Sequence, residues 1–155
     1  MKQQGKLRKI VVNIGVGRIK TDSKLIGQIA NSLTTITGAK PSRRTATKAI
    51  AGFKLKKGDL AGFTVTLRGK RMQDFLTRLT KLALPGDRDF KGIADSSIDQ
   101  SGNLTIGIKD MTIFPELRES SGSFSHGLEL TLVTEGLKRE QAKTFYEHLG
   151  ILFKK

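Results

Sequence analysis

Residues 60–68 read Leu-Ala-Gly-Phe-Thr-Val-Thr-Leu-Arg, and this alternation decides the fold class. The apolar residues from Phe63 to Leu67 fall on one face of a strand, whereas Thr64 and Thr66 fall on the other. A strand of this kind buries its apolar side against a core and leaves a hydroxyl-bearing side exposed. The pattern therefore predicts a sheet with one free face.

Helical periodicity follows this strand and also precedes it. Apolar side chains recur at helical spacing over residues 70–84, until a Pro-Gly pair ends the helix. An earlier helix is expected to begin at Asp22 or Ser23, either of which can cap it, and Gly38 lies where a C-terminal cap glycine belongs. A third amphipathic helix is predicted over residues 137–149.

Three further stretches read as strands, namely 8–14, 104–108 and 128–132. Their close spacing and strict alternation predict an α+β fold, a two-layer sandwich in which a mainly antiparallel sheet of four or five strands carries helices on one face. The chain, residues 1–155, is expected to form a single domain. Residues 85–103 lack periodicity and are predicted to form a long exposed loop.

Positive charge is concentrated in the first third of the chain. Residues 1–58 hold 14 of the 28 Lys and Arg residues but only one of the 14 acids, Asp22. The natural partner of such a one-sided field is a polyanion. Residues 40–58 supply seven of these cations and no acid, with hydroxyl groups that can donate to phosphate oxygens. This composition predicts a nucleic-acid-binding surface and leaves RNA and DNA open, so a basic architectural DNA-binding protein is the alternative.

Motifs for catalysis, metals and membranes are missing from the sequence. The chain has no Cys, and its two histidines, His126 and His148, are too few and too far apart for a zinc site. After Gly15 and Gly17, the third glycine of a dinucleotide-binding motif would fall at Lys20. No run of 18 apolar residues occurs. The protein is therefore expected to be no enzyme, to need no cofactor or metal, and to have no membrane partner.

Seven short motifs run through the chain: Ile10-Val-Val-Asn-Ile-Gly-Val-Gly17, Ile36-Thr-Gly-Ala-Lys-Pro41, Lys48-Ala-Ile-Ala-Gly-Phe-Lys54, Val65-Thr-Leu-Arg-Gly69, Ala83-Leu-Pro85, Arg88-Asp-Phe90 and Ile113-Phe-Pro-Glu116. In this order, over essentially the whole chain, they resemble the bacterial large-subunit ribosomal protein L5 family. The resemblance implies an α+β fold and a structural role in the central protuberance of the large ribosomal subunit. It also implies binding to 5S rRNA and a position facing the small-subunit head and the peptidyl-site tRNA.

The resemblance assigns roles to individual residues. In the family, the Asn that closes the first strand contacts 5S rRNA, and here it is Asn13. The Thr of the V-T-L-R strand does likewise, and here it is Thr66. The residue after I-T-G is often Gln in the family; Ala39 stands there in this chain and cannot hydrogen-bond through its side chain.

Charge and resemblance together give a set of expected contacts. The expected RNA-binding residues are Asn13, Gly15, Gly17, Lys40, Arg43, Arg44, Lys48, Lys54, Lys56, Thr66 and Arg68, and the loop expected to face tRNA carries Arg88, Phe90 and Lys91. Expected partners are 5S rRNA, large-subunit rRNA and neighbouring large-subunit proteins, with a small-subunit head protein and peptidyl-site tRNA beyond them. The protein is expected to be cytoplasmic and ribosome-bound.

Overall fold

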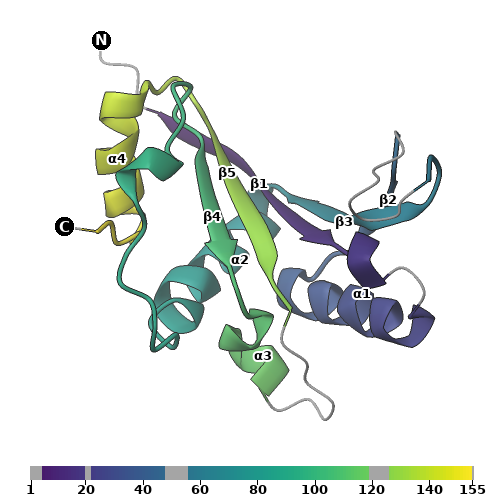
Figure 1. The fold of residues 1–155 in the computed structure, drawn as a ribbon. Helices are drawn as coiled ribbons and strands as arrows, with labels where there is room; N and C mark the ends of the chain where they lie inside the picture. Colours follow the sequence, from purple (N-terminus) through teal and green to yellow (C-terminus); the bar gives the residue numbers. More distant parts are fainter. Residues whose placement is uncertain (1–4, 20–21, 48–55, 119–125, 155) are drawn as a thin grey trace.

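A five-stranded antiparallel sheet forms the centre of the computed structural model, which describes residues 5–19, 22–47, 56–118 and 126–154 (Figure 1). The order across the sheet is β2-β3-β1-β5-β4, so the N-terminal strand is central, and each neighbouring pair is antiparallel. The strands are β1 (Lys6–Gly15), β2 (Ser42–Thr45), β3 (Leu60–Leu67), β4 (Leu104–Ile108) and β5 (Leu128–Glu135).

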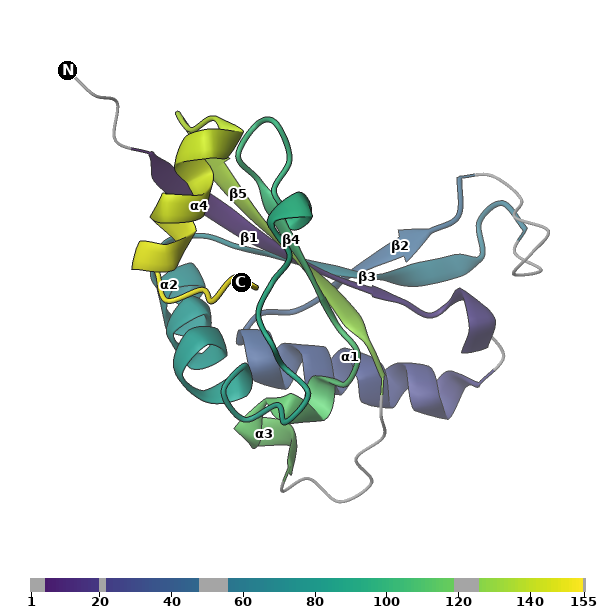
Figure 2. The same cartoon turned by 60° about the vertical axis from the view of Figure 1, so that its left-hand side comes forward.

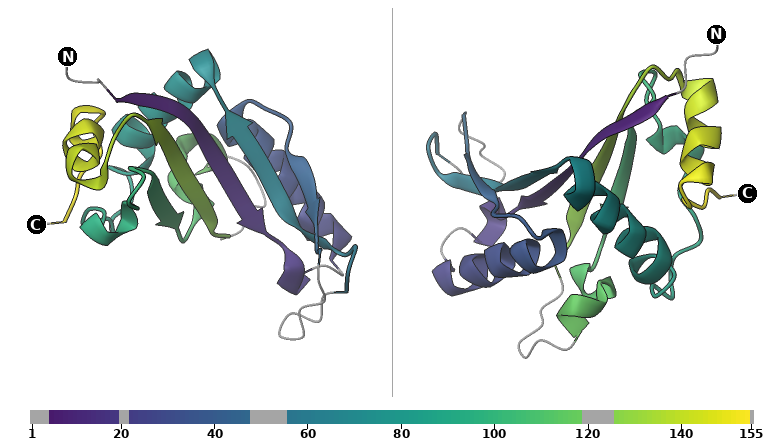
Figure 3. Two further views of the ribbon diagram at one scale, coloured as in Figure 1. Left: turned by 90° about the horizontal axis from the view of Figure 1, so that it is seen from above. Right: turned by 180° about the vertical axis from the view of Figure 1, so that it is seen from behind.

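Helices cover one face of this sheet and leave the other open (Figures 2 and 3). The helices are α1 (Ser23–Thr37), α2 (Gly69–Arg78), α3 (Pro115–Arg118) and α4 (Arg139–His148), with short turns η1 (Gly17–Ile19), η3 (Leu79–Ala83), η4 (Asp95–Ser97) and η5 (Met111–Ile113). In the left panel of Figure 3 the sheet lies in front of α1 and α2. The predicted α+β sandwich with helices on one face is confirmed.

The core lies between the helices and the strand faces that the alternation predicted. Ile10, Val12 and Ile14 of β1 are buried, while the residues between them are only half-buried. Beneath the sheet the rings of Phe75 and Phe114 stack with their centroids 5.7 Å apart. Each such side chain contributes roughly 1.5–3 kcal/mol by burial.

The ends of α1 follow its capping signals. Asp22 Oδ1 accepts a hydrogen bond from the backbone N–H of Leu25 at 3.0 Å. At the other end Gly38 adopts a left-handed conformation with φ of 72°, and its N–H donates to Thr34 O at 2.8 Å. A residue with a Cβ is disfavoured in that conformation, which explains the glycine. The helix expected from Asp22 or Ser23 to Gly38 is thus confirmed.

Residues 85–103, for which the sequence predicts a long exposed loop, contact the core and the C-terminal segment. Most of them are exposed, but Ile93 and Ile98 are buried. Ile93 exchanges backbone hydrogen bonds with the C-terminal segment, its N–H donating to Leu152 O at 2.8 Å and its carbonyl accepting from Lys154 N at 2.9 Å. Scattered Ile residues carry no periodic signal, and for that reason the sequence pattern did not reveal this packing.

Candidate nucleic-acid interface

A row of residues crosses the open face of the sheet at the level of Asn13. Asn13 lies directly opposite Thr64 of β3 on one side and opposite Glu129 of β5 on the other. Ser42 of β2 pairs with Thr64, and Gly107 of β4 pairs with Glu129, so the row spans all five strands. Residues directly opposite one another in antiparallel strands share a face. We call these five residues the central row.

Thr64 orients the side chain of Asn13 in this row. The hydroxyl Oγ1 of Thr64 donates to Asn13 Oδ1 at 2.6 Å, a length typical of an O–H···O bond and short for an N–H···O bond. Since the amide oxygen is engaged on this side, the amide NH₂ is the group that Asn13 presents on its other side.

Thr66 lies one step along the same face. It is exposed and pairs with Val11, which in turn pairs with Thr131 of β5. Asn13 and Thr66 are therefore diagonal neighbours across β1 and β3. Diagonal positions in antiparallel strands are typically about 7–8 Å apart. The structure places these two sequence-predicted residues on one surface, and the hydroxyl of Thr131 extends that surface toward β5.

Basic side chains gather at the β2 edge of the sheet. Arg43 and Arg44 lie in β2 and are exposed, as are Lys40 before the strand and Lys56 beyond it. Arg44 pairs with Gly62, on the open face, whereas Arg43 pairs with Phe63 and so points toward the helix side. The two arginines project from opposite sides of the edge strand. Lys48 and Lys54 lie outside the described residues.

The remaining predicted contacts lie at the ends of strands. Gly15 ends β1, where it is exposed and pairs with Gly62, and Gly17 begins η1. A Cβ added at Gly62 would collide with the carbonyl oxygen of Ile14, so the close approach of these strands requires glycine there. Arg68 is exposed at the start of α2, at the opposite end of β3.

A shallow hollow of about 580 Å³ lies on the open face beside Asn13. Asn13 and Glu129 line it, together with Lys109 and the glycines 15, 107 and 127. Because glycine has no side chain, a ligand can approach the backbone closely here. At one end of the hollow, His126 Nε2 lies 3.1 Å from Gly15 O and links the start of β5 to the end of β1.

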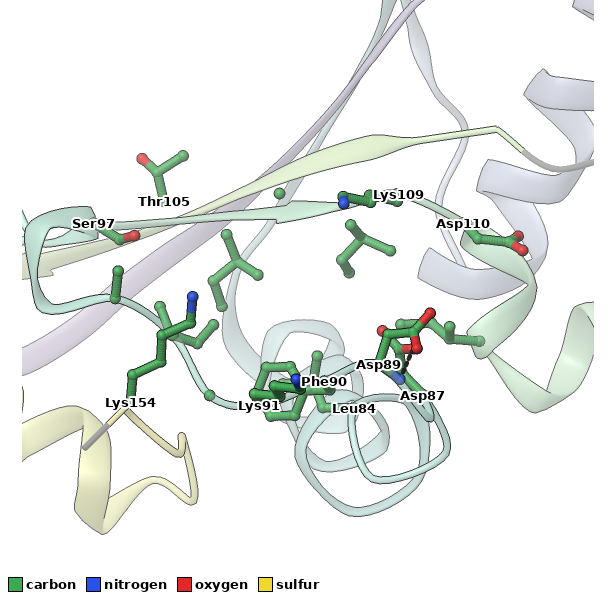
Figure 4. Close-up of a pocket in the computed structure, with 17 residues that line it drawn as sticks. Leu84, Asp87, Asp89, Phe90, Lys91, Ser97, Thr105, Lys109, Asp110 and Lys154 are labelled. Atoms are coloured by element: carbon green, nitrogen blue, oxygen red, sulfur yellow. Dashed lines mark hydrogen bonds between the residues drawn. The ribbon is translucent and has the colours of Figure 1, made fainter.

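The loop expected to face tRNA lies at the other edge of the sheet. Arg88 and Lys91 are exposed and Phe90 is half-buried. Figure 4 shows this loop facing β4 across a pocket of about 480 Å³, with acidic side chains near basic ones. The backbone N–H of Asp89 donates to Asp87 Oδ1 at 3.0 Å, which tightens the turn. The structure thus separates this loop from the basic β2 edge by the width of the sheet.

Of the five residues of the central row, only Asn13 is among the contacts expected from the sequence. Thr64 and Glu129 are the side chains beside it that were not predicted as contacts. Thr64 was recognised only as part of an exposed face, and Glu129 only as the polar position of an alternating strand. Their relation to Asn13 depends on strand register between residues 51 and 116 positions apart, which one sequence does not specify. Each of the three strands carries a polar residue, Asn13, Thr64 or Glu129, on its exposed face. Once the strand register is known, this pattern identifies Thr64 and Glu129 as neighbours of Asn13.

The described ranges contain neither a cluster of metal-ligand side chains nor a helix that could cross a membrane. Residues 5–19, 22–47, 56–118 and 126–154 hold no group of three or more His, Asp or Glu side chains that could bind a metal ion. Nor does any helix in the described part of the chain have the length and apolar character needed to cross a membrane.

The fold and this surface define a class: a two-layer α+β protein whose open sheet face is polar and whose edge strand is basic. Comparison with known proteins narrows the class. Residues 2–56 match the family model described as ribosomal protein L5, and residues 60–153 match the model that describes the C-terminus of the same ribosomal family.

Individual relatives agree along most of their length. The chain is 46% identical to the large ribosomal subunit protein uL5 of Corynebacterium kroppenstedtii over 147 residues, which is 95% of this chain and 80% of the relative. It is 43% identical to the uL5 protein of Syntrophomonas wolfei over 152 residues, 98% and 85% of the two chains. It is 44% identical to the uL5 protein of Mesoplasma florum over 153 residues, which is 99% of this chain and 85% of the relative.

The chain therefore belongs to the ribosomal protein L5 family. It is a protein of the large ribosomal subunit and not an enzyme. The architectural DNA-binding alternative is not favoured by this membership.

Proposed function

We propose that the chain binds 5S rRNA with the open face of its sheet and with the basic β2 edge, as a constituent of the central protuberance of the large ribosomal subunit. The observation that carries the proposal is the meeting of both features on one side: Asn13, Thr66 and Arg44 all belong to the open face. Family membership supports rRNA as the polyanion.

The two parts of this surface act in different ways. Exposed cations such as Arg44 and Lys40 bind phosphate oxygens and fix position without reading sequence. The amide of Asn13 and the hydroxyl of Thr66 offer directional hydrogen bonds to bases or to 2′-hydroxyl groups. Large-subunit rRNA and neighbouring proteins are expected at the rim of the same surface.

A second contact region belongs to the proposal. Because Arg88, Phe90 and Lys91 lie beyond β4, they stay accessible while the open face holds RNA. Two cations and a ring on one loop suit a structured RNA such as peptidyl-site tRNA, and the adjacent acids Asp87 and Asp89 suit a basic protein of the small-subunit head.

Binding to 5S rRNA and to an unrelated folded RNA of equal length, over about 50 to 200 mM salt, tests the main proposal. Contact with phosphates alone by 6 to 10 cations would lose roughly 10³ to 10⁵ in affinity over this range. Preference for 5S rRNA that persists at the highest salt supports a shaped site. Equal and steeply salt-dependent binding of both RNAs contradicts it.

The double substitution Asn13→Ala and Thr66→Ala is expected to weaken 5S rRNA binding by roughly 5- to 150-fold, because each removed hydrogen bond contributes about 0.5–1.5 kcal/mol. Affinity for the unrelated RNA should change little. Filter binding or fluorescence anisotropy measures both. Thr77→Ala, which removes an exposed hydroxyl from α2 on the helix side of the molecule, is the matched control. An unchanged preference for 5S rRNA in the double variant would remove Asn13 and Thr66 from the site.

A further inference from the structure

We propose that the central row binds the Watson–Crick edge of one unpaired guanine, with Asn13 donating to O6 and Glu129 accepting from N1–H and N2–H. The inference rests on the proposed rRNA-binding function. It adds a base-specific contact to a surface that otherwise positions phosphates and sugars.

The position of Glu129 needs a reason on a surface that binds a polyanion. Glu129 is exposed on the open face. The ion pairs among the described residues are Arg8–Glu135, Arg78–Glu116 and Lys143–Asp95, and none includes Glu129. Glu135, on the same face of the same strand, is paired with Arg8 at 2.8 Å. An unpaired carboxylate repels phosphate, so Glu129 opposes RNA binding unless the RNA offers it hydrogen-bond donors. Those donors are the amino and imino groups of bases and the 2′-hydroxyl of ribose.

Asn13 supplies the complementary group beside this carboxylate. The hydrogen bond from Thr64 Oγ1 occupies Asn13 Oδ1, so the NH₂ of Asn13 is directed away from β3, the side on which Glu129 lies. Thr64 is therefore a positioning residue, which selects the amide orientation that donates. Directly opposite Cβ atoms are about 4.5–5.5 Å apart, close enough for both side chains to meet one base.

The resulting order of groups is one donor followed by two acceptors. The Watson–Crick edge of guanine is complementary to this order, because it presents the O6 acceptor followed by the N1–H and N2–H donors. Guanine can therefore pair with all three protein groups. Uracil offers one donor between two acceptors, so its O2 would face a carboxylate oxygen. Cytosine has one donor and two acceptors, and adenine can match only two of the groups. A paired guanine has this edge occupied, so the base must be unpaired.

The hollow beside Asn13 provides room for such a base. A Cβ at Gly15 or Gly107 would meet no other atom, so these two glycines leave space that side chains would otherwise fill. Exposed Lys109, which also lines the hollow, offers a cation for a phosphate of the same nucleotide.

Glu129→Gln gives opposite results under the two readings of this residue. If Glu129 only repels phosphate, removal of its charge raises the affinity for 5S rRNA. If it binds guanine, the amide NH₂ of Gln meets a donor of the base, and affinity falls by roughly 5- to 150-fold. Glu135→Gln, which removes the same charge from the same strand, should not lower affinity. A gain or no change in Glu129→Gln overturns the proposal.

The role of Thr64 is tested by a double-mutant cycle. Thr64→Val keeps the β-branched shape and removes the donor, and it should weaken binding in the wild-type background but not in Asn13→Ala. Thr64→Ser should restore wild-type affinity, since it keeps the hydroxyl. An equal loss in both backgrounds would overturn the positioning role, because Thr64 would then act without Asn13.

Kethoxal, which modifies N1 and N2 of unpaired guanine, identifies the base. Bound wild-type protein should protect one guanine of 5S rRNA, and Glu129→Gln at saturating concentration should leave that guanine reactive. Protection of an adenine from dimethyl sulfate at this site, with every guanine still reactive, would overturn the proposal while leaving selective RNA binding intact. Wild-type binding without preference for 5S rRNA would overturn the proposed function and this inference together.

Discussion

At the scale of single residues, the buried hydroxyl of Tyr146 joins three segments of the chain. Its oxygen lies 2.7 Å from Gly102 O and 3.1 Å from Leu132 O, and Thr134 Oγ1 donates to the same Gly102 carbonyl at 2.8 Å. Tyr146 is the chain's only tyrosine and is fully buried. Burial raises its pKa from 10.0 to about 12.

The raised pKa predicts a loss of stability at alkaline pH. Below pH 10 the phenol is neutral in both states. Between about pH 10 and pH 12 the unfolded chain ionises and the folded chain does not, so the free energy of unfolding falls, by about 3 kcal/mol at most. Urea unfolding at about pH 8 to 11.5 measures this fall. In Tyr146→Phe, which costs about 1 kcal/mol at pH 8 through the lost hydrogen bond, the fall should be smaller. Equal pH dependence in both proteins would contradict it.

At the scale of secondary-structure elements, α1 depends on its caps more than on charge, because neither its first turn holds an acid nor its last turn a base. Asp22→Ala removes the acceptor for Leu25 N–H and is expected to lower the free energy of unfolding by about 1 kcal/mol. Asp22→Asn keeps an acceptor oxygen and should lie close to wild type. Chemical denaturation of the three proteins measures the difference, and a full loss in Asp22→Asn would point to charge instead of capping.

Elements with a local signal were predictable from the sequence, as α1, β3, β4 and the central strand β1 show. β2 was missed because Ser-Arg-Arg-Thr is short and wholly exposed, so no apolar alternation marks it. α2 was expected to continue unbroken to residue 84, but its last turn is a π-helix, with Leu84 N donating to Leu79 O at 2.9 Å. The helix period alone does not distinguish that widened turn from an α-helical one.

The candidate site was predictable only in part, for a related reason. The sequence identified the exposed side of β3 and the basic stretch before it, which are local properties. It did not pair Asn13 with Thr64, or place Arg43 and Arg44 on opposite sides of β2, because both follow from register and edge position. Contacts between strands that are distant in sequence can be identified only once the pairing of the strands in the folded sheet is known.

At the scale of the whole molecule, positive charge and directional groups lie side by side, so salt should separate their contributions. Arg43→Gln with Arg44→Gln is expected to reduce the slope of log affinity against log salt by about 1 to 2, since each phosphate contact contributes roughly 0.7–0.9. Affinity should fall similarly for all RNAs tested. Lys143→Gln, on the helix side and paired with Asp95 at 3.1 Å, is the control and should leave the slope unchanged. A slope that stays the same in the double variant would place the phosphates elsewhere.

The central position of β1 has a consequence for the order of events during synthesis. β1 is made before the other strands, yet its partner on one side, β5, is the last strand to be made. Between the synthesis of Leu67 and that of Glu135, roughly 3 to 14 s at translation rates of about 5–20 residues per second, one edge of β1 remains without its strand. An unpaired edge of that kind recruits other chains. The nascent protein thus has an interval in which early capture by RNA or by a chaperone protects it from aggregation.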